Sequence, residues 1–102
     1  MNKLLPAIIT GFEIIASRRG DLGIVVTVEH SGAITQSTAW EKIAPTQLHD
    51  RILGLLRVAG VESTDRLIDA EVRVEIRNGF ITAIGHVSQA RYWQSNYLRL
   101  VA

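Results

Sequence analysis

The chain has 102 residues, of which 47% are hydrophobic and 21% are charged, and its formal net charge is +1. This length fits one domain, and this much apolar surface excludes a disordered chain. Because there is no cysteine, a disulfide framework, a thiolate metal site and a cysteine nucleophile are all excluded, and a cytoplasmic protein is expected. No apolar run is long enough to cross a bilayer, so no membrane association is expected.

The first part of the chain has the alternation and turn residues of three consecutive strands. We expect the first strand over residues 8–17, with Gly11 marking a bend or bulge. A second strand is expected over 22–29, and Ser31-Gly32 turns the chain into a third over 33–40. These three strands predict an antiparallel meander.

A single helix follows the third strand. Pro45 suits the first helical position, and Gly60 stands where a left-handed residue ends a helix. Apolar residues recur between them at helical spacing, namely Leu48, Ile52, Leu55, Leu56 and Ala59. We therefore expect one amphipathic helix with its apolar stripe on the core.

The strongest local pattern is a hairpin after the helix. Residues 70–77 alternate strictly between apolar and charged side chains, and Asn78-Gly79 is typical of a type I′ turn. Residues 80–87 then return as the partner strand. With a two-residue turn, Glu75 should face Thr82 and Arg73 should face Ile84.

The expected order is strand, strand, strand, helix, strand, strand, which is the order of a five-stranded oligonucleotide/oligosaccharide-binding (OB) barrel. We expect residues 1–102 to form one mostly β OB-like domain with one helix. The tail, 88–102, is either a short sixth C-terminal strand or a partner-binding extension.

Two segments resemble small phage-type single-stranded DNA-binding proteins. Residues 53–61 are a leucine-rich helix end closing on Ala-Gly-Val, and 67–74 are a leucine followed by an alternating valine strand. Where those proteins have a Gly-Lys pair, this chain has Asp69-Ala70. The resemblance implies an OB fold and, with it, a phage or mobile-element origin and single-stranded DNA binding.

Candidate nucleic-acid-binding residues follow from residue type and position. Binding to single strands needs aromatic rings for the bases and cations for the phosphates. The outward face of the hairpin offers Arg73, Arg77 and Phe80, although ion pairs with Glu71 and Glu75 on a solvated face explain the same alternation.

The loops and tail add the remaining candidates. Trp40 lies on either a binding face or the helix, where it would pack against Leu48 and Ile52. Arg18 and Arg19 occupy a turn, which is either a ligand loop or simply solvated. The tail residues that complete the set are Arg91, Tyr92, Trp93 and Tyr97, with a half-buried final strand as the alternative.

The sequence predicts a non-enzymatic binding protein. It has no phosphate loop, nucleophile elbow or paired-histidine spacing, so neither a cofactor nor a metal is expected. The first hypothesis is binding of single-stranded DNA or RNA. The alternative is a protein-interaction module, such as a phage or plasmid inhibitor of a host defence complex or an assembly subunit. A homo-oligomer that pairs the first strand across a two-fold axis is compatible with both.

Overall fold

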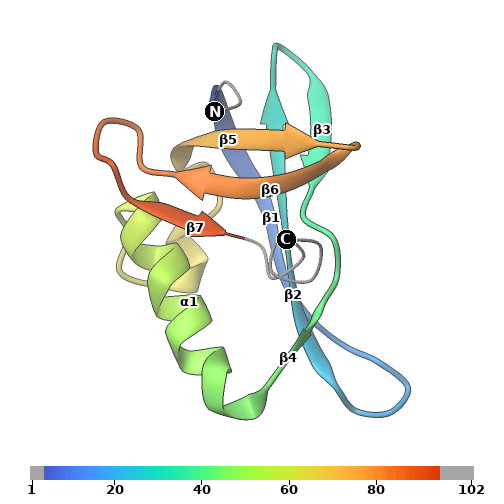
Figure 1. Cartoon of the computed structure of the whole chain (residues 1–102). Coiled ribbons are helices and arrows are strands. Elements are labelled where there is room, and N and C mark those ends of the chain that lie inside the picture. The colour runs from blue at the N-terminus through green and yellow to red at the C-terminus, as the bar shows by residue number, and fades with distance from the viewer. Residues whose placement is uncertain (1–3, 95–102) are drawn as a thin grey trace.

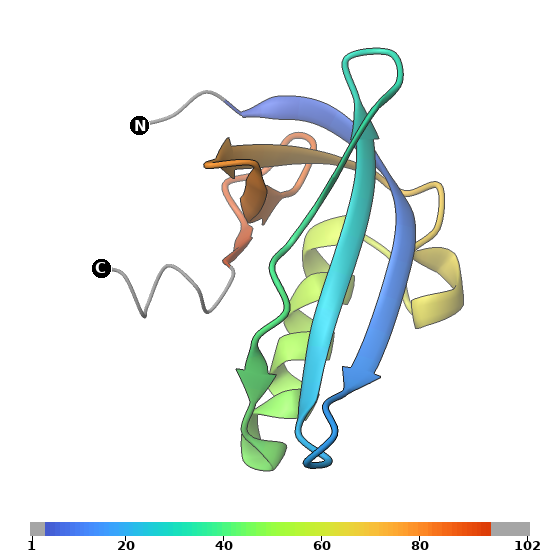
Figure 2. The same ribbon diagram turned by 90° about the vertical axis from the view of Figure 1, so that its right-hand side faces the viewer.

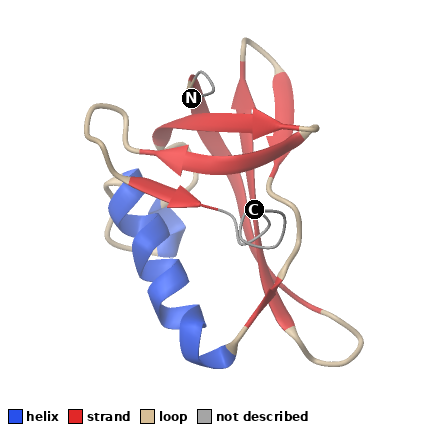
Figure 3. Cartoon of the chain, viewed as in Figure 1, coloured by secondary structure: helices blue, strands red, loops and turns tan. Residues whose placement is uncertain are grey.

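The computed structural model describes residues 4–94, which form a mostly β fold with one α-helix (Figures 1 and 3). The elements are β1 (Leu5–Ala16), β2 (Leu22–His30), β3 (Ile34–Ser37), β4 (Lys42–Ile43), α1 (Pro45–Ala59), the 3₁₀ turn η1 (Thr64–Arg66), β5 (Glu71–Arg77), β6 (Phe80–Gly85) and β7 (Tyr92–Gln94).

The seven strands form one sheet in the order β3-β2-β1-β5-β6-β7, with β4 paired to β2. Every pair of named strands is antiparallel. The sheet does not close, so the five-stranded barrel predicted from the element order is not confirmed. An isolated parallel bridge between Thr38 and Ile81 lies between the end of β3 and β6.

The predicted first strand and its irregularity are confirmed. Strand β1 pairs with β2 from Ala7 to Ala16, and the register shifts between Ile9 and Gly11. Only the first part of β1, Leu5 to Ile8, also pairs with β5. The second part of β1 and the adjoining part of β2 therefore extend past β5, β6 and β7 as a long arm beside the helix, and β4 pairs with β2 near the end of this arm (Figure 2).

The predicted third strand, 33–40, is shorter in the structure, where β3 ends at Ser37 and a separate short strand, β4, begins at Lys42. Thr38 still bonds to β2, since its N–H donates to the Val26 carbonyl over 2.9 Å and its hydroxyl accepts the Val26 N–H over 3.0 Å. The chain then leaves the ladder and returns with Lys42 opposite Gly23. This detour lets the indole N–H of Trp40 reach the carbonyl of Ile15 over 3.0 Å.

Helix α1 begins at Pro45 and ends before Gly60, as predicted. Gly60 has φ +72°, a left-handed conformation that favours glycine, and its N–H bonds back to the last turn. Of the predicted apolar stripe, Leu55 is buried and the other members are partly buried against the core. Val58, which is outside the predicted stripe, is buried as well. Within residues 4–94, no helix has the length and apolar character that crossing a membrane requires.

The core lies between the sheet and the helix. Its fully buried aliphatic side chains come from β1, β2, α1, β5, β6 and the residue after η1. They are Ile9, Val26, Val28, Leu55, Leu67, Val72, Val74, Ile81 and Ile84. Successive side chains of β2 and β5 point to opposite faces of the sheet, so one face of each strand lies in this core and the other lies outside it.

Candidate functional site

The outer face of the β5-β6-β7 sheet gathers four of the predicted residues. Arg77 lies directly opposite Phe80 beside the Asn78-Gly79 turn. Further along, Arg73 pairs with Gly85, and Gly85 pairs with Tyr92 on β7. Paired residues project to the same side of a sheet, so these side chains share one face. We call the set Arg73, Arg77, Phe80 and Tyr92 the outer-face cluster.

Both aromatic rings of this cluster are accessible. Phe80 is 45% exposed and Tyr92 is 44% exposed. The Tyr92 ring lies directly on Gly85, where a Cβ atom would be 2.9 Å from two of its ring carbons. Such cover of a strand glycine by an aromatic ring fixes the ring on the sheet. Each ring can therefore offer a surface to a ligand while it stays attached to the sheet.

The hairpin register differs from the predicted one beyond the first two pairs. Arg77 and Ile76 face Phe80 and Ile81 as predicted, but Glu75 faces Ala83 and Arg73 faces Gly85. A bulge inserts one extra residue on β6, because Thr82 has no partner of its own there. The predicted pairs of Glu75 with Thr82 and Arg73 with Ile84 are therefore wrong.

The bulge changes the environment of Glu75, which was predicted to be solvated but is buried, with 8% of its surface exposed. Its Oε1 accepts a hydrogen bond from the Thr82 hydroxyl over 3.0 Å and lies 3.1 Å from Nε of Arg77. A buried carboxylate needs such partners, because an unpaired one would carry a large desolvation cost. The ion pair joins Nε of Arg77 to this carboxylate, and the Arg77 side chain is still 48% exposed and so accessible to a ligand.

Arg73 is tied to the loop between β6 and β7. Its Nε donates to the carbonyl of His86 over 2.8 Å, and Nη2 donates to the carbonyl of Gln89 over 3.3 Å. Nδ1 of His86 in turn accepts the backbone N–H groups of Ser88 and Gln89 over 3.1 Å each. Arg73 therefore lies in the same cross-strand row as Tyr92, but two of its guanidinium nitrogens donate to backbone carbonyls of this loop.

Arg91 is exposed at the end of the same loop, directly before Tyr92. Its backbone N–H donates to Gln89 and its carbonyl accepts the N–H of His86, so the loop fixes the position of its Cα. The loop thus holds Arg91, an exposed cation, next to Tyr92 in the chain.

Trp93 does not belong to an exposed surface. It is 5% exposed, its indole N–H donates to the carbonyl of Arg51 over 2.9 Å, and the guanidinium of Arg51 covers the ring at 4.1 Å from its centroid. Tyr92 and Trp93 point to opposite faces because they are neighbours on a strand. The structure therefore places Trp93 in the core and not on the outer face, and its role in binding stays a prediction. Tyr97 lies outside the described residues.

Trp40 lies on the arm, away from the outer-face cluster. A cross-strand row joins Ile15, Gly23 and Lys42, and the indole of Trp40 covers Gly23 in the middle of that row. Gly23 projects opposite to the buried Ile24, so Trp40 lies on the outside of the sheet and not on Leu48 and Ile52 of the helix, which was the predicted alternative.

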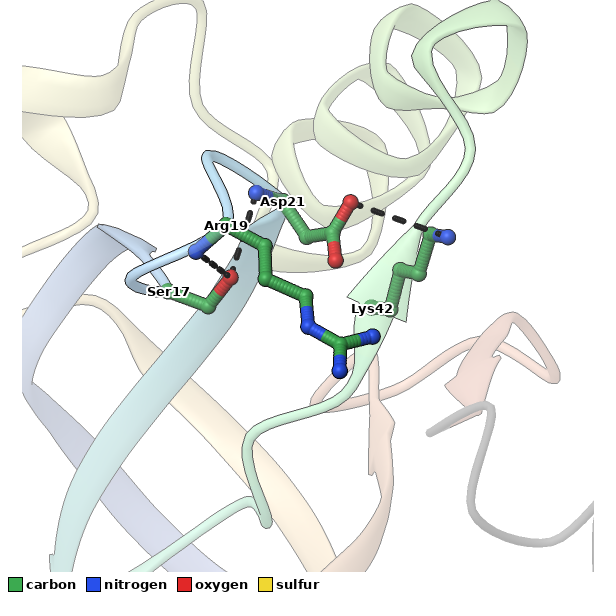
Figure 4. A network of polar contacts seen from close by, with 4 residues as sticks. All are labelled: Ser17, Arg19, Asp21 and Lys42. Atoms are coloured by element: carbon green, nitrogen blue, oxygen red, sulfur yellow. Dashed lines mark hydrogen bonds and ion pairs between the residues drawn. The ribbon is translucent and has the colours of Figure 1, made fainter.

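Arg18 and Arg19 occupy the turn at the end of the arm. The Ser17 hydroxyl accepts the N–H groups of Arg19 and Asp21, and Lys42 forms an ion pair of 3.6 Å with Asp21 (Figure 4). The end of the arm thus has Arg18 and Arg19 in its turn and Lys42 on the neighbouring strand β4, and Lys42 was missed by sequence reasoning. Its pairing with Gly23 depends on the detour after Thr38, which no local pattern predicts.

No protein-family model, curated protein or solved structure matches this chain. Among residues 4–94, no group of three or more histidine, aspartate, glutamate or cysteine side chains is arranged to hold a metal ion. The candidate site therefore rests on the geometry of the outer-face cluster.

Proposed function

We propose that this protein binds single-stranded nucleic acid on the outer-face cluster, as a small OB-like barrel. The observation that carries the proposal is the pairing of exposed aromatics with arginines in two cross-strand rows, Arg77 with Phe80 and Arg73 with Tyr92 across Gly85. A stacked base gains roughly 1–3 kcal/mol on an aromatic ring, and arginines neutralise the phosphates between bases.

The strand order supports the barrel interpretation. Strands β3, β2, β1, β5 and β6 follow one another in the sheet, with the helix between β4 and β5 in the chain. The parallel bridge between Thr38 and Ile81 brings the two ends of this series together. OB folds use the β1–β2 turn and the turn between the last two barrel strands for their ligands, and Arg18 with Arg19 and Arg77 with Phe80 occupy the corresponding turns here.

The test is a fluorescence-anisotropy titration of a labelled single-stranded oligonucleotide, with duplex DNA as control. Phe80→Ala should weaken binding about 10-fold, in line with the loss of one stacked base. Arg77→Glu should weaken it further and reduce the salt dependence, because a phosphate contact releases counterions. The matched control is Arg66→Glu on η1, which is exposed and lies off the outer face. Equal weakening by Arg66→Glu would reduce the proposal to non-specific charge attraction.

A protein-interaction module is the second candidate, and a groove that adjoins the outer-face cluster and shares Arg73 with it favours this candidate. Ile8, which is exposed, lies between Glu29 on β2 and Glu71 on β5 in one cross-strand row, and Val87 also lines this groove of about 540 Å³. Two carboxylates beside apolar side chains fit a basic protein segment and repel phosphates. In that case Glu71→Lys would abolish partner binding, while Arg77→Glu would leave it unchanged.

A further inference from the structure

The second part of β1 has a free edge. Beyond Ile9, whose backbone groups bond to Asp69 and Ala70, no strand pairs with the side of β1 that faces away from β2, within residues 4–94. In Figure 2 this edge is the outer side of the arm, below η1. An open edge seven residues long, from Thr10 to Ala16, is a template for another strand.

The backbone groups on this edge can be assigned. The N–H of Ser17 donates to the carbonyl of Asp21, so Ser17 faces the β2 side. Backbone groups alternate along an antiparallel strand, which directs Ile15 and Glu13 to β2 as well. Phe12, Ile14 and Ala16 therefore present their N–H and C=O groups to the open edge.

Natural edge strands are usually protected by lysine, proline or a bulge at the exposed positions. This edge has none of these between Phe12 and Ala16, and Ile14 is 45% exposed. Phe12, Ile14 and Ala16 also share one face, so the edge combines unpaired backbone groups with an apolar strip.

We propose that a second copy of this chain pairs with this edge, antiparallel and across a two-fold axis at Ile14. In this register Ile14 faces Ile14 of the second copy, and Phe12 faces Ala16 in both directions. All three edge residues of each copy then exchange both of their backbone hydrogen bonds. A register centred on Glu13 would oppose two carboxylates, which disfavours it.

Charge complementarity at the two ends of the paired segment supports the same register. The register centred on Ile14 places Arg18 of the second copy opposite Thr10, which is one residue from Ile9. The N–H of Asp69 donates to the Ile9 carbonyl over 2.8 Å, and the Asp69 side chain is exposed there. Each Arg18 thus approaches the other copy's Asp69. A two-fold axis through an antiparallel pair also puts both Trp40 rings on one face of the joined sheet.

Light scattering after size-exclusion chromatography tests the proposal on the full chain. The wild type should approach twice 11.3 kDa as its concentration rises to roughly 100 µM. Ile14→Pro removes an edge-facing N–H that β2 does not use, and it should leave a monomer. Ile14→Lys should do the same if the proline variant does not fold. The matched control, Ile34→Lys on β3, changes an exposed isoleucine away from the edge and should keep the dimer.

A cysteine variant tests the register itself, because the chain has no other cysteine. In the proposed register the two Ile14 Cα atoms lie about 5.5 Å apart, within disulfide range. Ile14→Cys should form a covalent dimer on mild oxidation, while Ile34→Cys should not. A wild type that stays monomeric at every concentration overturns the proposal. A dimer that persists in both Ile14→Pro and Ile14→Lys, without cross-linking through Ile14→Cys, overturns it equally.

Discussion

Gly23→Ala tests how Trp40 is held on the arm. A Cβ atom at position 23 would lie 2.4 Å from Nε1 of Trp40 and 2.5 Å from the carbonyl oxygen of Glu41. Rotation of the indole alone does not relieve the overlap, because the added Cβ also meets the backbone carbonyl of Glu41. The substitution should therefore displace the ring and break its hydrogen bond to the Ile15 carbonyl.

The magnitude follows from these two losses. Overpacking costs about 1–3 kcal/mol and the lost hydrogen bond about 1 kcal/mol, so the free energy of unfolding should fall by about 2–4 kcal/mol. For a domain of this size, each kcal/mol corresponds to a change in Tm of about 5 °C. Thermal unfolding followed by circular dichroism should thus show a Tm about 10–20 °C lower, and the native tryptophan emission should shift to the red.

Gly54→Ala is the matched control, because it also adds a methyl group beside a tryptophan. Its Cβ would lie 3.5 Å from Cδ1 of Trp93, an ordinary contact, and the site is inside helix α1. Alanine is the better helix former by about 0.5–1 kcal/mol, so this variant should raise Tm by a few degrees. A Gly23→Ala protein with wild-type Tm and emission would refute the description of the Trp40 contact.

Three further substitutions test single contacts, each by chemical denaturation. Thr82→Val is nearly isosteric and removes the hydroxyl that bonds the buried carboxylate of Glu75, so it should lower the free energy of unfolding by about 1–3 kcal/mol. No change in the free energy of unfolding would show that Glu75 is solvated. Gly60→Ala puts a Cβ atom at φ +72° and should cost about 1 kcal/mol, and no loss would contradict the left-handed helix end. Trp93→Phe loses the hydrogen bond to the Arg51 carbonyl and should cost about 1–3 kcal/mol; a fully stable variant would argue against a buried Trp93.

Local signals in the sequence predicted the elements well. Pro45 and Gly60 bound the helix as expected, and Asn78-Gly79 forms the hairpin turn, with φ +52° and +81°. Gly11 marks the irregularity in β1. In these places one or two residues have conformations that few others adopt, so the pattern is specific.

The candidate site was less predictable, because it depends on contacts between distant strands. The bulge at Thr82 has no glycine or other local signal, yet it buries Glu75 and moves Arg73 opposite Gly85. Trp93 looked like part of an aromatic surface, but its burial depends on Arg51 and the helix, 42 residues earlier. Composition therefore predicts which residue types are available, and tertiary packing decides which of them are exposed.

The most direct test of the outer-face cluster is amide chemical-shift mapping of the labelled protein with a single-stranded oligonucleotide at low salt. The proposal predicts that the largest shift changes cluster at Arg77, Phe80, Gly85 and Tyr92 and decrease as salt is added. Saturating oligonucleotide that causes no shift changes, or changes confined to the groove at Ile8, would contradict it.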